Sequence, residues 1–406
     1  MRAIKYRELK RLHDNQGPRF MVKHLTEALK TGQLAPEDFS LNELYEACMG
    51  SEALRRLDPR KDDMILEFGG ISGVDSTAFS NITGQLAISK VLEGYASPDF
   101  ALTRMIGTVS TRIKDTEIIP GLQGMGDVSE VVHEQELYPH VGFGENYITT
   151  PRKVKRGCIC AVTKEAIFFD LTGQMLSNAN KMGYTLGLNR EIRVADLILG
   201  VTNNYNWLGN ALNTYYDATT SATAAAATGL NIWINIHRNP LVDWTDVDHA
   251  EQLFARMRDP FTNMPIIITG KTLLVMPQLR HSTRMIINST EVRRDNTNQR
   301  TLAANPLDPY PIVASEFLYM RALAAGWTTP ENCWWLGDFK RAFSLIQNWD
   351  ITTSQAPSNS EAEFNQDIVA RFKASVREVE AVMEPRAVVR SCASYDLSSS
   401  SGEIPR

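Results

Sequence analysis

The fold is decided by residues 170–200, DLTGQMLSNANKMGYTLGLNREIRVADLILG. Asp170 or Thr172 can cap a helix that begins here, and a helix from Thr172 to Gly200 would be about 40 Å long. Gly183 and Gly187 each cost roughly 1 kcal/mol relative to alanine inside a helix, so we expect them to admit a close neighbour. The inward positions of this helix follow a spacing of four, three and four residues, and they are Met175, Ala179, Met182 and Leu186.

The segment before this helix, residues 104–169, changes character. Stretches rich in β-branched residues, 106–119 and 147–169, flank a centre rich in glycine and acidic residues. This pattern predicts a long two-stranded β excursion. Such a hairpin has little apolar mass of its own, so it needs a partner surface. The residues of the centre that we expect to serve assembly, by bending or by polar contact, are Gly121, Gly124, Gly126, Glu130, Glu134, Glu136, Gly142 and Gly144. A solvated acidic tip is the alternative for the glutamates.

The residues after the long helix predict a mixed lobe. The small-residue tract 218–229 is interpreted as a surface loop. Thr245 and Asp248 are interpreted as a capping box that starts a helix. Residues 271–276 predict a buried strand that leads through Pro277 into a further helix. Residues 367–377 alternate apolar and polar side chains, which is typical of a half-buried antiparallel strand.

The first 60 residues predict short helices separated by turns. Residues 1–30 carry eight Lys or Arg against three acidic residues, on a chain of net charge −5. This basic arm is either a solvated amphipathic helix or a contact to DNA or to a partner protein. The residues proposed for such a contact are Arg2, Lys5, Arg7, Lys10 and Arg11.

Composition limits the classes of protein that fit. The chain has 406 residues, 43% hydrophobic and 22% charged, as in ordinary globular proteins. Its apolar stretches are far shorter than the ~20 residues that span a bilayer, and residues 1–13 lack the apolar core of a secretory signal. We therefore expect no membrane segment and a cytoplasmic protein. Its five scattered cysteines favour reduced thiols over a disulfide framework.

The motifs that suggest catalysis do not have the required spacing. Residues 269–272, Thr-Gly-Lys-Thr, end like a phosphate-binding loop, but Pro265 stands where that loop needs a glycine, and a strand pattern follows. A hairpin turn fits better. Cys158 and Cys160 would share one face of a strand, but no second Cys or His pair stands nearby, so core thiols are favoured over a zinc site. We expect no enzyme, no cofactor and no metal.

The order of the predicted parts resembles the Hong Kong 97-type capsid fold, an α+β fold. Residues 154–170, with Val154-Lys-Arg-Gly157 and Val162-Thr-Lys-Glu165, resemble the E-loop return strand and the entry to the spine helix, especially in the Mu-like major head subunit group. Residues 264–277 resemble a segment of the A-domain, and 334–338 and 367–372 the closing strands of the P-domain. The resemblance covers about residues 75–392.

The resemblance implies a division of the chain. It places an N-terminal arm at 1–75, a connection at 76–103, the E-loop at 104–169, the spine helix of the P-domain at 170–215, the A-domain at 216–335, the closing P-domain strands at 336–392 and a mobile tail at 393–406.

It also implies a function, that of a major capsid protein of a tailed bacteriophage. Copies would assemble in the host cytoplasm into hexamers and pentamers of an icosahedral shell around double-stranded DNA. Portal and scaffold proteins would be partners, and a decoration protein is a further candidate. An encapsulin-like nanocompartment shell and, more remotely, a soluble hydrolase or nucleotide-binding enzyme are the alternatives. One member of that family crosslinks an E-loop lysine to an asparagine of a neighbouring subunit. Lys114 is a candidate for such a lysine, although a solvated lysine is the simpler interpretation.

Overall fold

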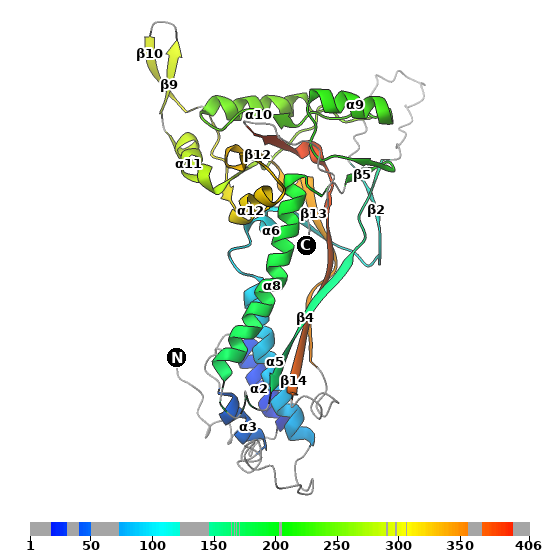
Figure 1. Ribbon diagram of the computed structural model, residues 1–406, viewed down its shortest axis with the longest axis vertical. Helices are drawn as coiled ribbons and strands as arrows, with labels where there is room; N and C mark the ends of the chain where they lie inside the picture. The colour runs from blue at the N-terminus through cyan, green and yellow to red at the C-terminus, as the bar shows by residue number, and fades with distance from the viewer. Residues whose placement is uncertain are drawn as a thin grey trace, which may run out of the picture. The chain divides into compact units, whose positions relative to one another are not determined.

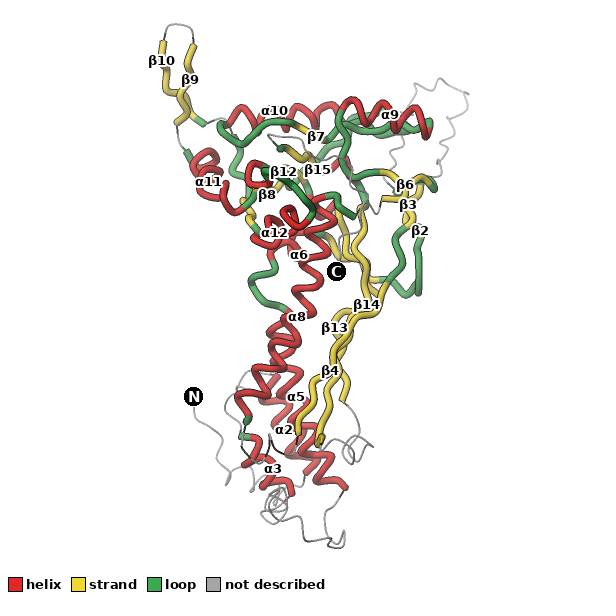
Figure 2. Tube along the Cα trace, in the orientation of Figure 1, coloured by secondary structure: helices red, strands yellow, loops and turns green. Residues whose placement is uncertain are grey.

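The computed structural model describes residues 18–30, 40–49, 73–121, 146–202 without 164, 166, 168 and 170, 205–289, 291–305 without 297 and 298, 307–355 and 368–392. These residues form two compact units, each built from several chain segments. Unit 1 comprises residues 1–99, 155–189 and 349–377, and unit 2 comprises 100–154, 190–348 and 378–406. The helices and strands confirm the predicted mixture of both (Figure 2).

Unit 1 packs helices against extended strands. Its helices are α2 (Pro18–Lys30), α3 (Leu41–Met49), α5 (Gly73–Tyr95) and the first part of α8 (Thr172–Leu199), and its strands are most of β4 (Val154–Thr163) and parts of β13 (Phe343–Gln355) and β14 (Ile368–Val382). β14 lies beside β4 in the sheet.

The long helix α8 confirms the prediction for residues 172–200. Its four predicted inward residues are all buried in one apolar cluster with Leu86 and Val91 of α5 and with Phe372 and Ala374 of β14. The alternation predicted for 367–377 is observed in part. Phe372, Ala374 and Val376 are buried in a strand and Lys373 is exposed, but Ser375 is buried as well.

Unit 2 is built around a five-stranded mixed sheet in the order β11-β8-β12-β15-β7. The strands are β7 (Ile236–His237), β8 (Thr272–Val275), β11 (Ile312–Ala314), β12 (Trp334–Gly337) and β15 (Val388–Ser391). Every residue of β12 and β15 is buried. Their side chains point to both faces of the sheet, so both faces are covered, and these strands show no polar alternation in sequence.

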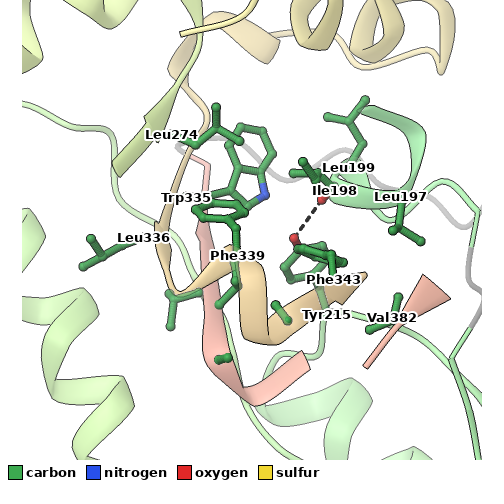
Figure 3. Packing of buried hydrophobic residues seen from close by; sticks show 14 of the residues in the cluster. Leu197, Ile198, Leu199, Tyr215, Leu274, Trp335, Leu336, Phe339, Phe343 and Val382 are labelled. Carbon is green, nitrogen blue, oxygen red and sulfur yellow. Dashed lines mark hydrogen bonds between the residues drawn. The ribbon is translucent and has the colours of Figure 1, made fainter. Parts of the chain in front are cut away.

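The helices of unit 2 surround this sheet. They are α6 (Ala101–Met105), α9 (Ala218–Thr228), α10 (Trp244–Arg256), α11 (Arg280–Asn288), α12 (Glu316–Ala324) and α13 (Phe339–Ala342), with short 3-10 turns at Pro277–Leu279, Pro330–Asn332 and Pro385–Ala387. Figure 3 shows the centre of the core, where the Tyr215 hydroxyl donates to the Ile198 carbonyl oxygen at 2.7 Å beside Trp335.

Unit 2 also carries smaller β structures. The strands β2 (Ile118–Pro120), β3 (Tyr147–Thr149), β5 (Tyr205–Trp207) and β6 (Asn210–Leu212) form a sheet in that order, and β1 (Gly107–Ser110) pairs in parallel with β13. β9 (Glu291–Asn296) and β10 (Gln299–Ala304) form a two-stranded hairpin that reaches away from the five-stranded sheet (Figure 1).

The pairing of the strands corrects the prediction of one long hairpin over 104–169. Among the described residues of this segment, only the short strands β2 and β3 pair with each other, whereas β1 pairs with β13 and β4 lies beside β14. The strand residues were identified correctly, but their partners lie almost 200 residues or more further along the chain, which periodicity does not reveal.

The small-residue tract 218–229 is helix α9, so the prediction of a surface loop was wrong. Asp217 caps the helix through a capping box with Thr220, and Gly229 ends it in the left-handed conformation with φ of 71°. Alanine has the highest helix propensity, and these two end signals outweigh the interspersed threonines. The capping box of α10 is likewise formed by Asp243 and Asp246, two residues before the predicted pair.

One pair of cysteines departs from the predicted reduced state. Cys333 and Cys392 form a disulfide, while Cys48, Cys158 and Cys160 are thiols. The register of β12 and β15 explains the disulfide. Trp334 lies opposite Ser391 in this antiparallel pair, so Cys333, just before Trp334, and Cys392, just after Ser391, lie at the same end of the two strands. Cys158 and Cys160 pack against the apolar cluster of unit 1, and burial raises the pKa of both thiols.

Candidate assembly site

The segment 122–145, which holds most of the predicted assembly residues, starts and ends at a firmly paired base. Within the base, Ile118, Ile119 and Pro120 lie opposite Thr149, Ile148 and Tyr147. The ladder continues when the Gly121 amide donates to the Asn146 carbonyl oxygen at 3.0 Å. β3 is in turn hydrogen-bonded to β5, so both ends of the segment are attached to the same small sheet.

The Asn146 side chain connects this base to a buried aromatic cluster. The indole nitrogen of Trp207 donates to Asn146 Oδ1 at 2.6 Å, and the Arg386 guanidinium lies 5.1 Å from the Trp207 ring centroid and 4.7 Å from that of Trp233. A Cβ at position 121 would lie 2.7 Å from Asn146 Oδ1. Gly121 therefore allows a close approach of the two ends, and its predicted function as a bending point stays a prediction.

A buried lysine fixes the loop 111–117 at the same base. The Lys153 side chain is 0% exposed, and its ammonium donates to the carbonyl oxygens of Ile113 and Asp115 and to Glu117 Oε2, at 3.1, 3.3 and 2.9 Å. These three acceptors match the three protons of an ammonium group. Asn348 Nδ2 adds hydrogen bonds to the carbonyl oxygens of residues 111 and 113, at 3.0 and 2.8 Å.

The sequence did not single out Lys153, Asn146 or Trp207. Lys153 is one of several basic residues around position 153, and two of its three acceptors are backbone oxygens about 40 residues earlier. Lys114, the crosslinking candidate, is exposed in the loop that Lys153 organises. Its function in crosslinking stays a prediction.

Comparison with known proteins places this architecture in a family. The sequence model described as "Phage capsid protein" matches residues 147–391, which is 245 of 406 residues. The chain belongs to the phage capsid protein family. This family is one of structural proteins of the virion, and the match confirms the interpretation drawn from the order of helices and strands. It does not favour the nanocompartment alternative.

Similar solved structures include three capsid proteins of low sequence identity. The capsid of a native GTA particle is 13% identical to this chain, with a TM-score of 0.41. The aligned part covers 73% of this chain and 91% of the GTA capsid chain. The protein of Gordonia phage Cozz is 13% identical with a TM-score of 0.41, at 74% and 88% coverage, and that of Mycobacterium phage Bobi is 14% identical with a TM-score of 0.40, at 73% and 90%. No curated protein matches the chain. The family assignment rests on the sequence model.

Several of the predicted assembly residues of this capsid protein lie outside the described residues. This holds for Gly124, Gly126, Glu130, Glu134, Glu136, Gly142 and Gly144, and also for the predicted contact residues Arg2, Lys5, Arg7, Lys10 and Arg11. Their functions stay predictions. No described helix is long and apolar enough to cross a membrane.

The two glycines predicted to admit a neighbour lie on the buried side of α8 in the capsid protein. Gly183 faces α5, because a Cβ there would lie 2.0 Å from the Val91 carbonyl oxygen. From the other helix, a Cβ at Gly94 would lie 2.2 Å from the Asn180 carbonyl oxygen. The backbones of α5 and α8 therefore meet at two reciprocal glycines, and Gly187 is buried one turn further along α8.

The residues that resemble a phosphate-binding loop form a turn before β8. Gly270 has φ of 72°, and Lys271 Nζ pairs with Glu251 Oε1 at 2.8 Å. Glu251 also accepts a hydrogen bond from the Tyr310 hydroxyl. The turn is confirmed, but residues 266–268 form no strand, so it is not the predicted hairpin turn.

Replacing Glu251 with glutamine is expected to make the stability of the capsid protein less dependent on pH. Burial raises the pKa of Glu251, but the hydrogen bonds from Lys271 and Tyr310 outweigh it, and the net pKa is lowered. A carboxylate with a lowered pKa contributes stability above its unfolded pKa of about 4.3 and loses it as the pH falls through the folded pKa. Glu251→Gln should therefore lower the free energy of unfolding at pH 7 by less than about 1 kcal/mol, since the pair is partly solvent-exposed.

Urea unfolding at pH 7, 5 and 3.5 tests this expectation. The difference between Glu251→Gln and the wild type should shrink towards pH 3.5. Asp248→Asn on the same helix is the control, because Asp248 accepts only from the side chain of Gln252 within the described residues. A deficit in Glu251→Gln that stays constant across the three pH values would contradict the assignment.

Proposed function

We propose that this phage capsid protein is the major head subunit, whose copies assemble into hexamers and pentamers of an icosahedral shell around double-stranded DNA. The observation that carries the proposal is the base of the segment 122–145. It is held by a β ladder, by the Asn146–Trp207 hydrogen bond and by the buried ammonium of Lys153. Such a base fixes the two points at which a polar segment leaves the small sheet, and a contact between subunits requires fixed ends of this kind.

In this proposal, the parts of the chain have the functions that the resemblance implied. Residues 104–169 act as the E-loop that lies over a neighbouring subunit, 170–215 and 336–392 form the P-domain, 216–335 form the A-domain at the symmetry axes, and 1–75 tie adjacent subunits together. The glycines 124, 126, 142 and 144 allow one sequence to adopt slightly different E-loop angles in hexamers and pentamers. Portal and scaffold proteins and packaged DNA are the further partners, and assembly takes place in the host cytoplasm.

Deleting residues 123–144 and joining the ends with a short Gly-Ser linker tests the proposal. The deletion leaves Gly121, Asn146 and Lys153 in place, so the melting temperature should stay close to that of the wild type. Shell formation, followed by electron microscopy and sedimentation, should be lost. Normal shells from the deletion variant would refute the assembly function of this segment, and a wild-type chain that forms no shells with its scaffold would refute the proposed function itself.

A further inference from the structure

The exposed side of α11 carries several basic side chains. Arg280, His281 and Arg284 are exposed on it, and the side chain of Met285 beside them is 77% exposed, whereas Thr283 and Ile287 face the core. These spacings of one, four and five residues place the exposed side chains on one face of a helix. We call Arg280, His281, Arg284 and Met285 the basic face.

Most buried or half-buried cations of unit 2 have an acidic partner. Lys153 pairs with Glu117, Arg321 with Asp196 and Arg386 with Glu384. By contrast, no carboxylate among the described residues pairs with Arg280 or Arg284, and the sequence has no Asp or Glu from Pro277 to Thr290. The basic face is therefore a local positive field on a chain of net charge −5, which attracts an anionic partner.

The same chain contains a segment of the opposite charge. Residues 122–145 include Asp127, Glu130, Glu134, Glu136 and Glu145 but no Lys or Arg. Both ends of this acidic segment are fixed at β2 and β3, so each half of its 24 residues can extend at most about 40 Å from the base. Charges that match in this way fix the register and the choice of partner at an interface.

The geometry of unit 2 points to a contact between two copies. β2 and β3, from which the acidic segment departs, lie on the right of unit 2 in Figure 2, and α11 lies on the left. A contact from one side of a subunit to the opposite side of the next is heterologous, and such contacts repeat around a ring when the rotation closes. This is the arrangement that a hexamer or a pentamer needs.

We propose that the basic face of α11 binds the acidic segment 122–145 of a second copy of this chain. The inference rests on the proposed function and adds to it the partner of the segment and the chemistry of recognition. The carboxylates of the segment pair with Arg280 and Arg284, and its apolar residues, such as Val131 and Val132, contact Met285. Because the basic face is exposed, salt weakens the contact.

Charge reversal on each side, and on both sides together, tests the pairing in the full-length chain. Arg280→Glu with Arg284→Glu and, separately, Glu130→Lys with Glu134→Lys should each raise the protein concentration at which shells appear by about tenfold or more, because attraction becomes repulsion. The variant with all four substitutions has the wild-type net charge and should assemble within about threefold of the wild type. Light scattering and electron microscopy measure the concentration at which shells appear. Arg280 and Arg284 are exposed, so their replacement leaves the core untouched.

A matched control separates pairing from net charge. Arg256→Glu with Arg258→Glu reverses two exposed arginines of the same unit and should neither impair assembly as strongly nor rescue Glu130→Lys with Glu134→Lys. Rescue by this control, or no rescue by the Arg280 and Arg284 pair, would overturn the proposal. Arg280→Gln with Arg284→Gln should give an intermediate effect, which covers the case of a charge-reversed variant that fails to fold.

Two other outcomes are distinguishable. If the defect of Arg280→Glu with Arg284→Glu appears only when double-stranded DNA is added to the assembly reaction, the basic face binds phosphate and the proposal is wrong. If the wild type forms shells but the variant with all four substitutions does not recover assembly, only this pairing is refuted. If the wild type forms no shells, the proposed function fails and this inference falls with it.

Discussion

Replacing Glu378 with alanine is expected to lower the free energy of unfolding of the capsid protein by about 3–5 kcal/mol. The Glu378 side chain is 1% exposed and pairs with Arg190 at 2.7 Å and with Arg193 at 2.5 Å. Its removal leaves two largely buried guanidinium groups with fewer partners. Removing one partner from a buried charge network costs more than the pair contributed, which is why this single substitution has so large an effect.

Urea denaturation of Glu378→Ala beside Glu380→Ala measures this effect. Glu380 pairs with Arg193 alone among the described residues and is 12% exposed, so its loss should cost clearly less. Glu378→Gln keeps the shape and some hydrogen bonds and should fall between the two. Equal losses for Glu378→Ala and Glu380→Ala would show that the shared carboxylate of Glu378 is not the centre of this network.

Gly183→Ala is expected to destabilise the capsid protein by about 2 kcal/mol or more, although alanine is the better helix former by about 1 kcal/mol. The added methyl group would lie 2.0 Å from the Val91 carbonyl oxygen and 3.0 Å from the Tyr95 amide nitrogen. Both are backbone atoms, so α5 and α8 must move apart. The steric cost therefore exceeds the gain in helix propensity.

Gly173→Ala in the same helix provides the control. No atom lies within 4 Å of a Cβ at position 173, so propensity alone should act there and stabilise the protein by up to about 1 kcal/mol. Thermal and urea unfolding of both variants should give shifts of opposite sign. A stabilised Gly183→Ala would mean that α5 and α8 are not in backbone contact at this point.

The glycines of α8 show how much of the fold could be predicted from the sequence. The helical period of residues 175–186 predicted α8 and its buried face, because a 28-residue helix repeats its pattern several times. The cost of Gly183 and Gly187 in a helix also indicated a close neighbour. The neighbour is α5, which lies some 90 residues earlier in the chain, so no local pattern around Gly183 identifies it.

Strand partners and long-range pairs could not be predicted for the same reason. A strand shows its period locally, but its register with β13 or β14 depends on residues that follow almost 200 or more positions later. Cys333 and Cys392 meet only because β12 and β15 are neighbours. The acceptors of Lys153 are mainly carbonyl oxygens, which every residue carries. By contrast, α9 could have been predicted, since Asp217, the alanines and Gly229 are local signals of a helix.

The burial of Lys153 has a chemical consequence for the capsid protein. An amine reacts with acylating reagents only when its nitrogen is accessible and presents a lone pair, and Lys153 is enclosed with its protons held by three oxygens. Lys155, two residues later, is exposed. Lys155 therefore serves as an internal reference for Lys153. The rate of acylation of Lys153 relative to that of Lys155 reports how often the base of the segment 122–145 opens.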